Sequence, residues 1–160
     1  MINTENLVVV ETASFQWPSD LQVPSKYFRL FVAANATNVP TEQISRFVEE
    51  SHRKGMVYFC TWGPDCERVH DIADEVLADQ KIFGPLLFTP ITHNDTVMTT
   101  WHDDDTLEDA LESFVSNSCP TESYVKESDM WLVFSVANSA WTSSIREQIR
   151  KLMKSSQEPH

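Results

Sequence analysis

A cysteine and a histidine stand four residues apart at the start of a predicted helix, and this pair could carry nucleophilic chemistry. Cys66 and His70 share one edge of the helix, because residues i and i+4 lie on the same helix face. Cys66 lies in the first turn, where the helix dipole lowers the pKa of a thiol and favours a thiolate paired with an imidazolium. The pair is therefore a candidate for the centre of a small hydrolase or transferase.

The same side chains could instead hold a metal ion. His102 follows a later predicted strand and precedes an acidic run at residues 103–105. Cysteine, histidine and carboxylate groups are zinc ligands, and the acidic run alone could bind magnesium. Each feature also has a structural interpretation. Cys66 and His70 can be packing residues at the edge of an apolar stripe, and Asp105 can cap the following helix. Thr106 and Asp109 are a second candidate for that cap, as a capping box.

Strand and helix patterns around Cys66 explain how these groups would be positioned. Residues 56–61 form an unbroken apolar run, which is typical of a strand covered on both faces of a parallel sheet. Gly63 ends the strand, and we expect Pro64 to open the next helix directly, since the first helical amide needs no partner. The apolar stripe of this helix consists of Val69, Ile72, Ala73, Val76 and Leu77.

An apolar run followed by an amphipathic stretch occurs four times along the chain. The predicted strands cover residues 27–34, 56–61, 96–101 and 130–137, each with a helix after it. Because parallel neighbours need crossover connections, this alternation predicts an α/β fold. We expect a three-layer sandwich with a mainly parallel sheet of four to five strands, flavodoxin-like or Rossmann-like. A flavodoxin-like order would place the second core strand outside the first.

Segments outside this pattern are less regular. Residues 1–26 are interpreted as a leading strand and an irregular loop, residues 27–155 as a single α/β domain, and residues 156–160 as a frayed tail. Thr41 is expected to cap the first helix, which Gly55 closes. Residues 84–85, Gly-Pro, are expected to break the chain before a short strand at residues 86–88.

Composition narrows the classes of partner. The 160 residues include 12 basic and 24 acidic side chains, a formal net charge of −12. This average field repels nucleic acid, whereas it suits a basic protein partner. No apolar run is long enough for a membrane span, the first residues do not resemble a signal peptide, and three cysteines fit a reducing compartment. We therefore expect a cytoplasmic protein with neither membrane nor nucleic acid among its partners.

Polar groups and tryptophans gather where the predicted strands end. The chain has only three glycines and hence no glycine-rich phosphate loop, so we expect no bound cofactor. Ligands of open α/β sheets bind at the carboxyl ends of the strands, and tryptophan there can form a stacking wall or anchor a partner. The predicted ligand- or partner-binding residues are Asn35, Trp62, Asp65, Arg68, Trp101, Asp103, Asp104, Asn138 and Trp141.

Two blocks, WGPDCERVHD at residues 62–71 and TTWHDD at residues 99–104, resemble the signature blocks of a family of small uncharacterised bacterial proteins. The resemblance covers the chain from the central strand to the third helix. It implies a bacterial or bacteriophage origin and no particular activity. It also suggests that the two blocks form one site, with Arg68 as a counter-ion for Asp103 or Asp104.

Two functions follow from these observations. The first is a non-enzymatic, acidic recognition module of the immunity, antitoxin or defence-accessory kind. Such a module would bind a protein or a small ligand at the rim formed by the strand ends. The alternative is a small hydrolase or transferase that uses Cys66 as nucleophile, or a metal ion held by Cys66, His70 and His102.

Overall fold

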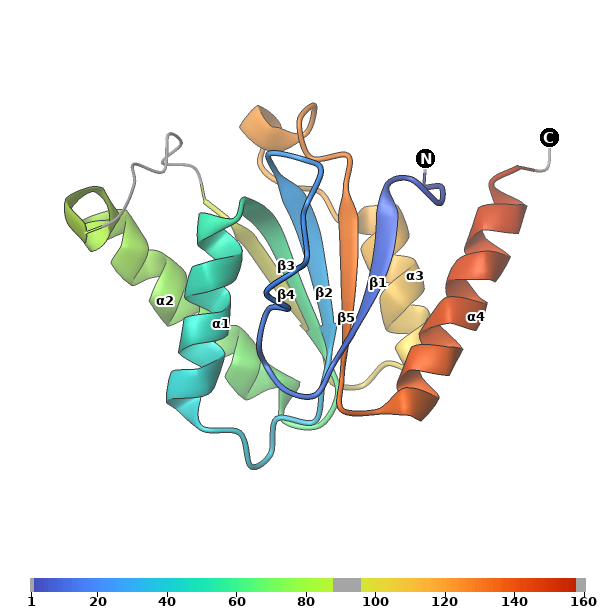
Figure 1. The fold of residues 1–160 in the computed structure, drawn as a ribbon, viewed down its shortest axis with the longest axis horizontal. Coiled ribbons are helices and arrows are strands. Elements are labelled where there is room, and N and C mark those ends of the chain that lie inside the picture. The colour runs from blue at the N-terminus through green and yellow to red at the C-terminus, as the bar shows by residue number, and fades with distance from the viewer. Residues whose placement is uncertain (1, 88–95, 158–160) are drawn as a thin grey trace.

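A five-stranded parallel sheet forms the centre of the molecule (Figure 1). The computed structural model describes residues 2–87 and 96–157. The strands are arranged in the order β1-β5-β2-β3-β4. Their bounds are Leu7–Thr12 for β1, Phe28–Ala33 for β2, Met56–Trp62 for β3, Met98–His102 for β4 and Trp131–Val136 for β5.

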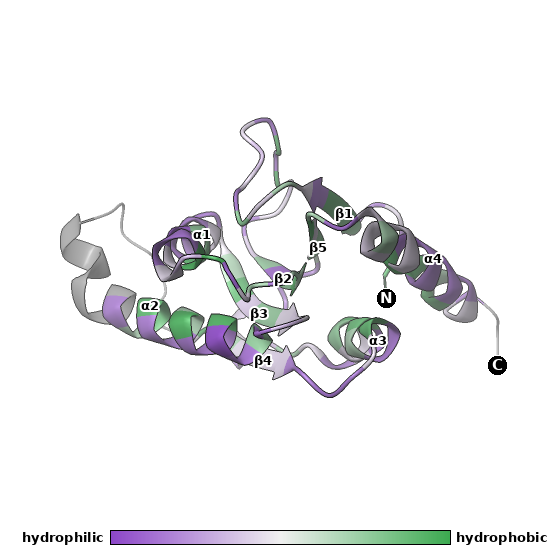
Figure 2. Cartoon of the chain, turned by 90° about the horizontal axis from the view of Figure 1, so that it is seen from below, coloured by the Kyte–Doolittle hydropathy of each residue, from purple (hydrophilic) through white to green (hydrophobic). Residues whose placement is uncertain are grey.

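Helices cover both faces of the sheet, which confirms the predicted three-layer α/β sandwich. Figure 2 shows α1 and α2 on one side of the strands and α3 and α4 on the other. The helices are α1 at Thr41–Arg53, α2 at Cys66–Leu87, α3 at Leu107–Asn117 and α4 at Ser139–Ser155, with a short 3-10 helix at Glu122–Tyr124. No helix in these described ranges is long and apolar enough to cross a bilayer.

The continuous apolar runs exist because the strands are buried on both faces. Successive side chains of a strand point to opposite faces of the sheet. In β2, Leu30 and Val32 belong to the core beneath α1 and α2, whereas Phe31 and Ala33 belong to the core beneath α3 and α4. Both layers thus require apolar residues, and a continuous apolar run is the result.

The segment between β1 and β2 replaces a helix on the α1 side of the sheet. It has no regular structure, as predicted, and passes across the sheet beside α1 (Figure 1). Trp17 is only 4% exposed and lies 4.9 Å from Phe134 and 5.6 Å from Phe28, measured between ring centroids. Its indole N–H donates to the Ser51 hydroxyl at 2.8 Å. This loop is therefore part of the hydrophobic core.

The order of the strands differs from the flavodoxin-like order expected. β3 lies between β2 and β4, so the second core strand is inside the sheet, and the edge position expected for it belongs to β4. The helix after β2 lies on one face of the sheet, and the helix after β5 lies on the opposite face (Figure 2). A crevice at the carboxyl ends of β2 and β5 is therefore the topological switch point, where ligands bind in open α/β sheets.

Two helix starts correct the sequence-based expectations. Helix α2 begins at Cys66, not at Pro64, because Asp65 has a φ of +66° and turns the chain before the helix. The N-cap of α1 is Pro40 without a side-chain cap, and Thr41 is already helical. Gly55 does close α1, with a φ of +112°.

Two further boundaries differ as well. Of the two predicted caps of α3, Thr106 is the N-cap and Asp105 is not: the Thr106 hydroxyl accepts from the backbone N–H of Asp109 at 3.1 Å. Helix α2 continues through residues 84–85 to Leu87, so the predicted chain break and the strand at residues 86–87 were wrong. Phe88, the last residue of that predicted strand, lies outside the described residues.

Candidate functional site

A hollow of about 320 Å³ lies at the switch point between the carboxyl ends of β2 and β5. Asn35 follows β2, Asn138 follows β5, and Trp141 lies in the first turn of α4; all three line the hollow. Gln43 of α1 lines it too, and none of its lining side chains is charged. The hollow thus differs from the chain as a whole, which has a net charge of −12.

The two asparagines are held in place by their side-chain oxygens. Oδ1 of Asn35 accepts from the backbone N–H and the hydroxyl of Thr37, at 3.1 and 2.7 Å. Oδ1 of Asn138 caps α4 by accepting from the backbone N–H of Trp141 at 3.0 Å. Since each oxygen is used in this way, each side chain offers its amide NH₂ group as a hydrogen-bond donor.

The backbone at the end of β5 is strained and well supported. Ala137 has a φ of +53°, which is uncommon for a residue other than glycine. Its N–H donates to the carbonyl of Thr12 at 2.7 Å, which joins the ends of β1 and β5. The Thr142 hydroxyl donates to the Ser135 hydroxyl at 2.8 Å and so ties α4 to the strand. Backbone strain of this kind persists where the surroundings enforce it, often at functional sites.

Arg68 positions the loop that leads from β2 into α1. Its guanidinium bonds to Asp65 at 2.6 Å and donates to the carbonyls of Ala36 and Val39. The predicted ion pair of Arg68 with Asp103 or Asp104 was therefore wrong, because Arg68 projects toward α1 and the turn before α2 supplies Asp65 as its partner. Arg68 instead holds Val39 at the edge of the hollow.

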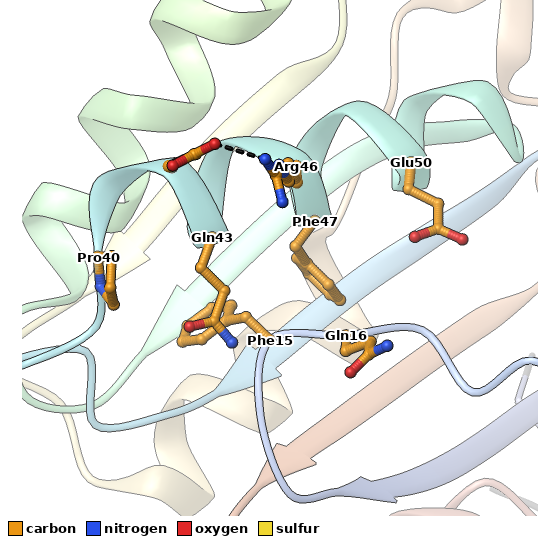
Figure 3. Close-up of a pocket in the computed structure, with 8 residues that line it drawn as sticks. Phe15, Gln16, Pro40, Gln43, Arg46, Phe47 and Glu50 are labelled. Atoms are coloured by element: carbon orange, nitrogen blue, oxygen red, sulfur yellow. Dashed lines mark hydrogen bonds and ion pairs between the residues drawn. The ribbon is translucent and has the colours of Figure 1, made fainter.

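A second hollow of about 490 Å³ continues from the first, between the β1–β2 segment and α1 (Figure 3). The two hollows share Phe15 and Gln43. Figure 3 shows Gln16 opposite α1. Arg46 and Glu42, which also line this hollow, form an ion pair. Together the hollows form an open groove that leads to the strand ends.

Cys66 does not have the surroundings of an attacking thiolate. Cys66 is only 1% exposed, and this burial raises the pKa of its thiol. A hydrogen bond with the backbone of His102 lowers the pKa in part, but burial outweighs it. The helix-dipole effect expected from the sequence is therefore not the dominant influence on this cysteine.

His70 braces α2 against the edge strand β4. Its Nδ1 lies 3.2 Å from Asp71 and its Nε2 lies 3.1 Å from the Thr99 hydroxyl. That hydroxyl donates to Asp74 at 2.6 Å, so His70 is not placed to take its proton. The imidazole ring lies 4.3 Å from the ring of Trp101, measured between centroids.

His102 is engaged with the loop that follows β4. Its Nδ1 lies 2.5 Å from the side-chain carboxylate of Asp105. The backbone carbonyl of Asp105 accepts from the indole N–H of Trp62 at 2.8 Å. Trp62 in turn meets Trp141 edge-on at 5.1 Å between ring centroids. Within residues 2–87 and 96–157, no three histidine, cysteine, aspartate or glutamate side chains are placed to share a metal ion. The set of Cys66, His70 and His102 is thus not assembled as zinc ligands.

Six of the nine predicted binding residues therefore fall into two groups. Asn35, Asn138 and Trp141 gather around the switch-point hollow, whereas Trp101, Asp103 and Asp104 lie at the exposed end of the edge strand β4. The sequence reasoning missed Phe15, Val39 and Gln43. Phe15 precedes Trp17-Pro18 in an irregular segment, and no periodicity there indicates burial.

Cys60, in the centre of β3, predicts a pH dependence of stability. Burial raises the pKa of its thiol to about 12 from 9.0. The folded protein then retains a proton that the unfolded chain loses, so stability falls as the pH rises from 9 towards 12. We expect this residue to lower the free energy of unfolding by up to about 1.4 kcal/mol per pH unit, measured by urea denaturation.

The matched control is Cys60→Ala, which removes the titrating thiol. Burial also raises the pKa of Tyr58, which acts in the same direction in both proteins. The stability of the variant is expected to decline less steeply above pH 9. Equal slopes for the two proteins would show that the thiol does not contribute.

Comparison with known proteins assigns the chain to a family. The model of a family described as a domain of unknown function (DUF7684) matches residues 8–154, from β1 to the last turns of α4. No curated protein and no solved structure matches the chain. The match therefore includes every strand and helix of the sandwich.

Proposed function

Since the chain belongs to the family described as a domain of unknown function (DUF7684), we propose a function from its geometry: a recognition module that binds a small ligand at the switch point. The observation that carries this proposal is the uncharged hollow between the carboxyl ends of β2 and β5. Its volume of about 320 Å³ is at the lower end of the range of ligand sites.

The lining of the hollow indicates which chemistry it would recognise. Trp141 offers an aromatic surface to a planar group. The amide NH₂ groups of Asn35 and Asn138 are donors, so they favour a ligand that carries acceptor oxygens. A small planar molecule with carbonyl, carboxylate or phosphate oxygens has both features.

The alternative of a hydrolase or transferase has less support. Its nucleophile would be Cys66, which is buried and whose pKa is raised. The two ring nitrogens of His70 contact Asp71 and Thr99. The described residues offer a binding site more clearly than a catalytic one.

We place this module, as a wider proposal, among acidic bacterial or phage proteins of the immunity, antitoxin or defence-accessory kind. The support is the single α/β domain together with the net charge of −12, which suits a basic protein partner.

The proposal is tested by replacing one donor of the hollow. Asn138→Asp keeps the oxygen that caps α4 but exchanges the NH₂ donor for a carboxylate oxygen, which repels acceptor oxygens. Adenosine, adenosine monophosphate and free tryptophan serve as planar probes, followed by NMR of the isotope-labelled protein. We expect saturable shifts at residues 35 and 137–141 with at least one probe, and their loss in Asn138→Asp.

The matched control is Asn38→Asp, the same exchange at an exposed residue that does not line the hollow. It is expected to leave probe binding unchanged. Equal loss in both variants would point to net charge alone. An absence of shifts around the hollow with all probes at millimolar concentration would contradict the proposal.

A further inference from the structure

The outer edge of β4 is a surface that the switch-point hollow does not use. β4 is the last strand of the sheet and pairs only with β3 among the described strands. The outward backbone N–H and C=O groups of an edge strand form a ready template for another extended chain. Natural proteins usually cover, shorten or charge such an edge.

Apolar side chains are exposed along this edge. Met98 is 41% exposed and Trp101 is 40% exposed, and they are two of the three large hydrophobic residues exposed in the described parts of the chain. The ring of Trp101 lies 4.3 Å from the ring of His70, measured between centroids. Thr99, two residues before Trp101 in β4, donates its hydroxyl to Asp74 of α2. Trp101 is therefore held in a defined position although solvent reaches it.

The surroundings of the edge are strongly acidic. Helix α2 lies beside β4 (Figure 2), and Arg68 is the only lysine or arginine between residues 66 and 79. Arg68 is already paired with Asp65. Asp103 and Asp104 continue the negative charge beyond the end of β4. The exposed acidic residues of α2 are Glu67, Asp71, Asp74, Glu75 and Asp79.

We propose that the edge of β4 binds an extended segment of a basic protein partner, which adds to the sheet as a sixth strand. Backbone hydrogen bonds would supply affinity, and alternate lysine or arginine side chains would face Trp101 and the carboxylates of α2. The apolar side chains between them would face the other side of the sheet, where Met98 is exposed. The same carboxylates oppose pairing with the identical edge of a second copy, because like charges would meet. The proposal does not depend on the ligand of the hollow.

A short synthetic peptide of alternating lysine and valine is the probe, and the full-length protein is used. NMR of the isotope-labelled protein is expected to show shifts and slowed hydrogen exchange at residues 98–102, with the affinity measured by calorimetry. The same peptide with N-methyl groups on alternate amides, which blocks strand pairing, is expected not to bind. A peptide of alternating glutamate and valine is also expected not to bind.

Charge variants locate the binding surface. The double variant Glu67→Gln, Asp71→Asn is expected to weaken binding of the lysine peptide about fivefold. The matched control, Glu108→Gln with Glu112→Gln on α3, removes the same charge from the opposite face and is expected to leave the affinity unchanged.

Four outcomes would overturn the proposal. These are an absence of shifts on β4, undiminished binding of the N-methylated peptide, equal weakening by both pairs of charge variants, and self-association of the protein that protects residues 98–102 without peptide. The last outcome would identify a second copy as the occupant of the edge. None of these results depends on whether the hollow binds a probe.

Discussion

Replacing Trp17 by alanine is expected to lower the free energy of unfolding by about 3–5 kcal/mol, as for other large buried aromatic residues. The indole is 4% exposed and packs against Phe28, Phe47 and Phe134. The indole lies between helix α1, which carries Phe47, and the strands β2 and β5, so its removal leaves a cavity among these three elements. Urea denaturation at neutral pH measures the change.

Two further variants separate packing from hydrogen bonding. Ser51→Ala removes the acceptor of the indole N–H and is expected to cost about 1–2 kcal/mol, because a buried donor is left unsatisfied. Trp17→Phe keeps most of the aromatic volume and is expected to fall between the two. A loss of less than about 1 kcal/mol in Trp17→Ala would show that the segment between β1 and β2 is not part of the core.

Replacing Gly63 by alanine is the second large effect expected. Gly63 has a φ of +115°, and a Cβ atom on it would lie 2.2 Å from the backbone carbonyl oxygen of Ala34. Backbone strain and this clash together are expected to lower the free energy of unfolding by about 3 kcal/mol or more. Thermal and urea unfolding measure the loss.

Gly63→Asn distinguishes the two causes of that loss. Asparagine tolerates a positive φ better than alanine, but its Cβ would meet the same carbonyl. Equal losses in the two variants are therefore expected if the clash dominates. Pro64→Ala, at the exposed neighbouring position, is the control and is expected to change stability by less than about 1 kcal/mol. Near-normal stability of Gly63→Ala would refute the close approach of the two strand ends.

The Gly63 variant also bears on the candidate site. Ala34 immediately precedes Asn35 and donates its N–H to the carbonyl of Trp62 at 3.0 Å. A displaced Ala34 would move Asn35 away from the hollow. In any fraction of the variant that remains folded, weaker binding of planar probes is expected, again measured by NMR.

The residues of the strands determined the fold class without the tertiary structure. The run at residues 56–61 is apolar at every position except Thr61 because β3 is covered on both faces, and such a run is visible locally. The positions of Asn35 and Asn138 at strand ends could likewise be predicted from the sequence, since each residue follows a predicted strand. What the carboxyl end of a strand is used for depends on its neighbours, and those neighbours are distant in sequence.

Only the tertiary structure decided which strand ends are adjacent. β5 lies between β1 and β2, although more than a hundred residues separate it from β1, and no local pattern encodes that pairing. The hollow exists because of this order. The same reason explains why Arg68 pairs with Asp65 and not with Asp103. The partner of Arg68 depends on the face of α2 from which its side chain projects.

Burial of single side chains was also decided by the tertiary structure. Cys66 and Trp17 stand in polar or irregular surroundings in the sequence, yet both are buried. Helical or strand periodicity reveals the inward face of a regular element, but a loop has no period. The chain therefore determined its layers through local patterns of apolar residues, whereas contacts between distant segments determined the candidate site.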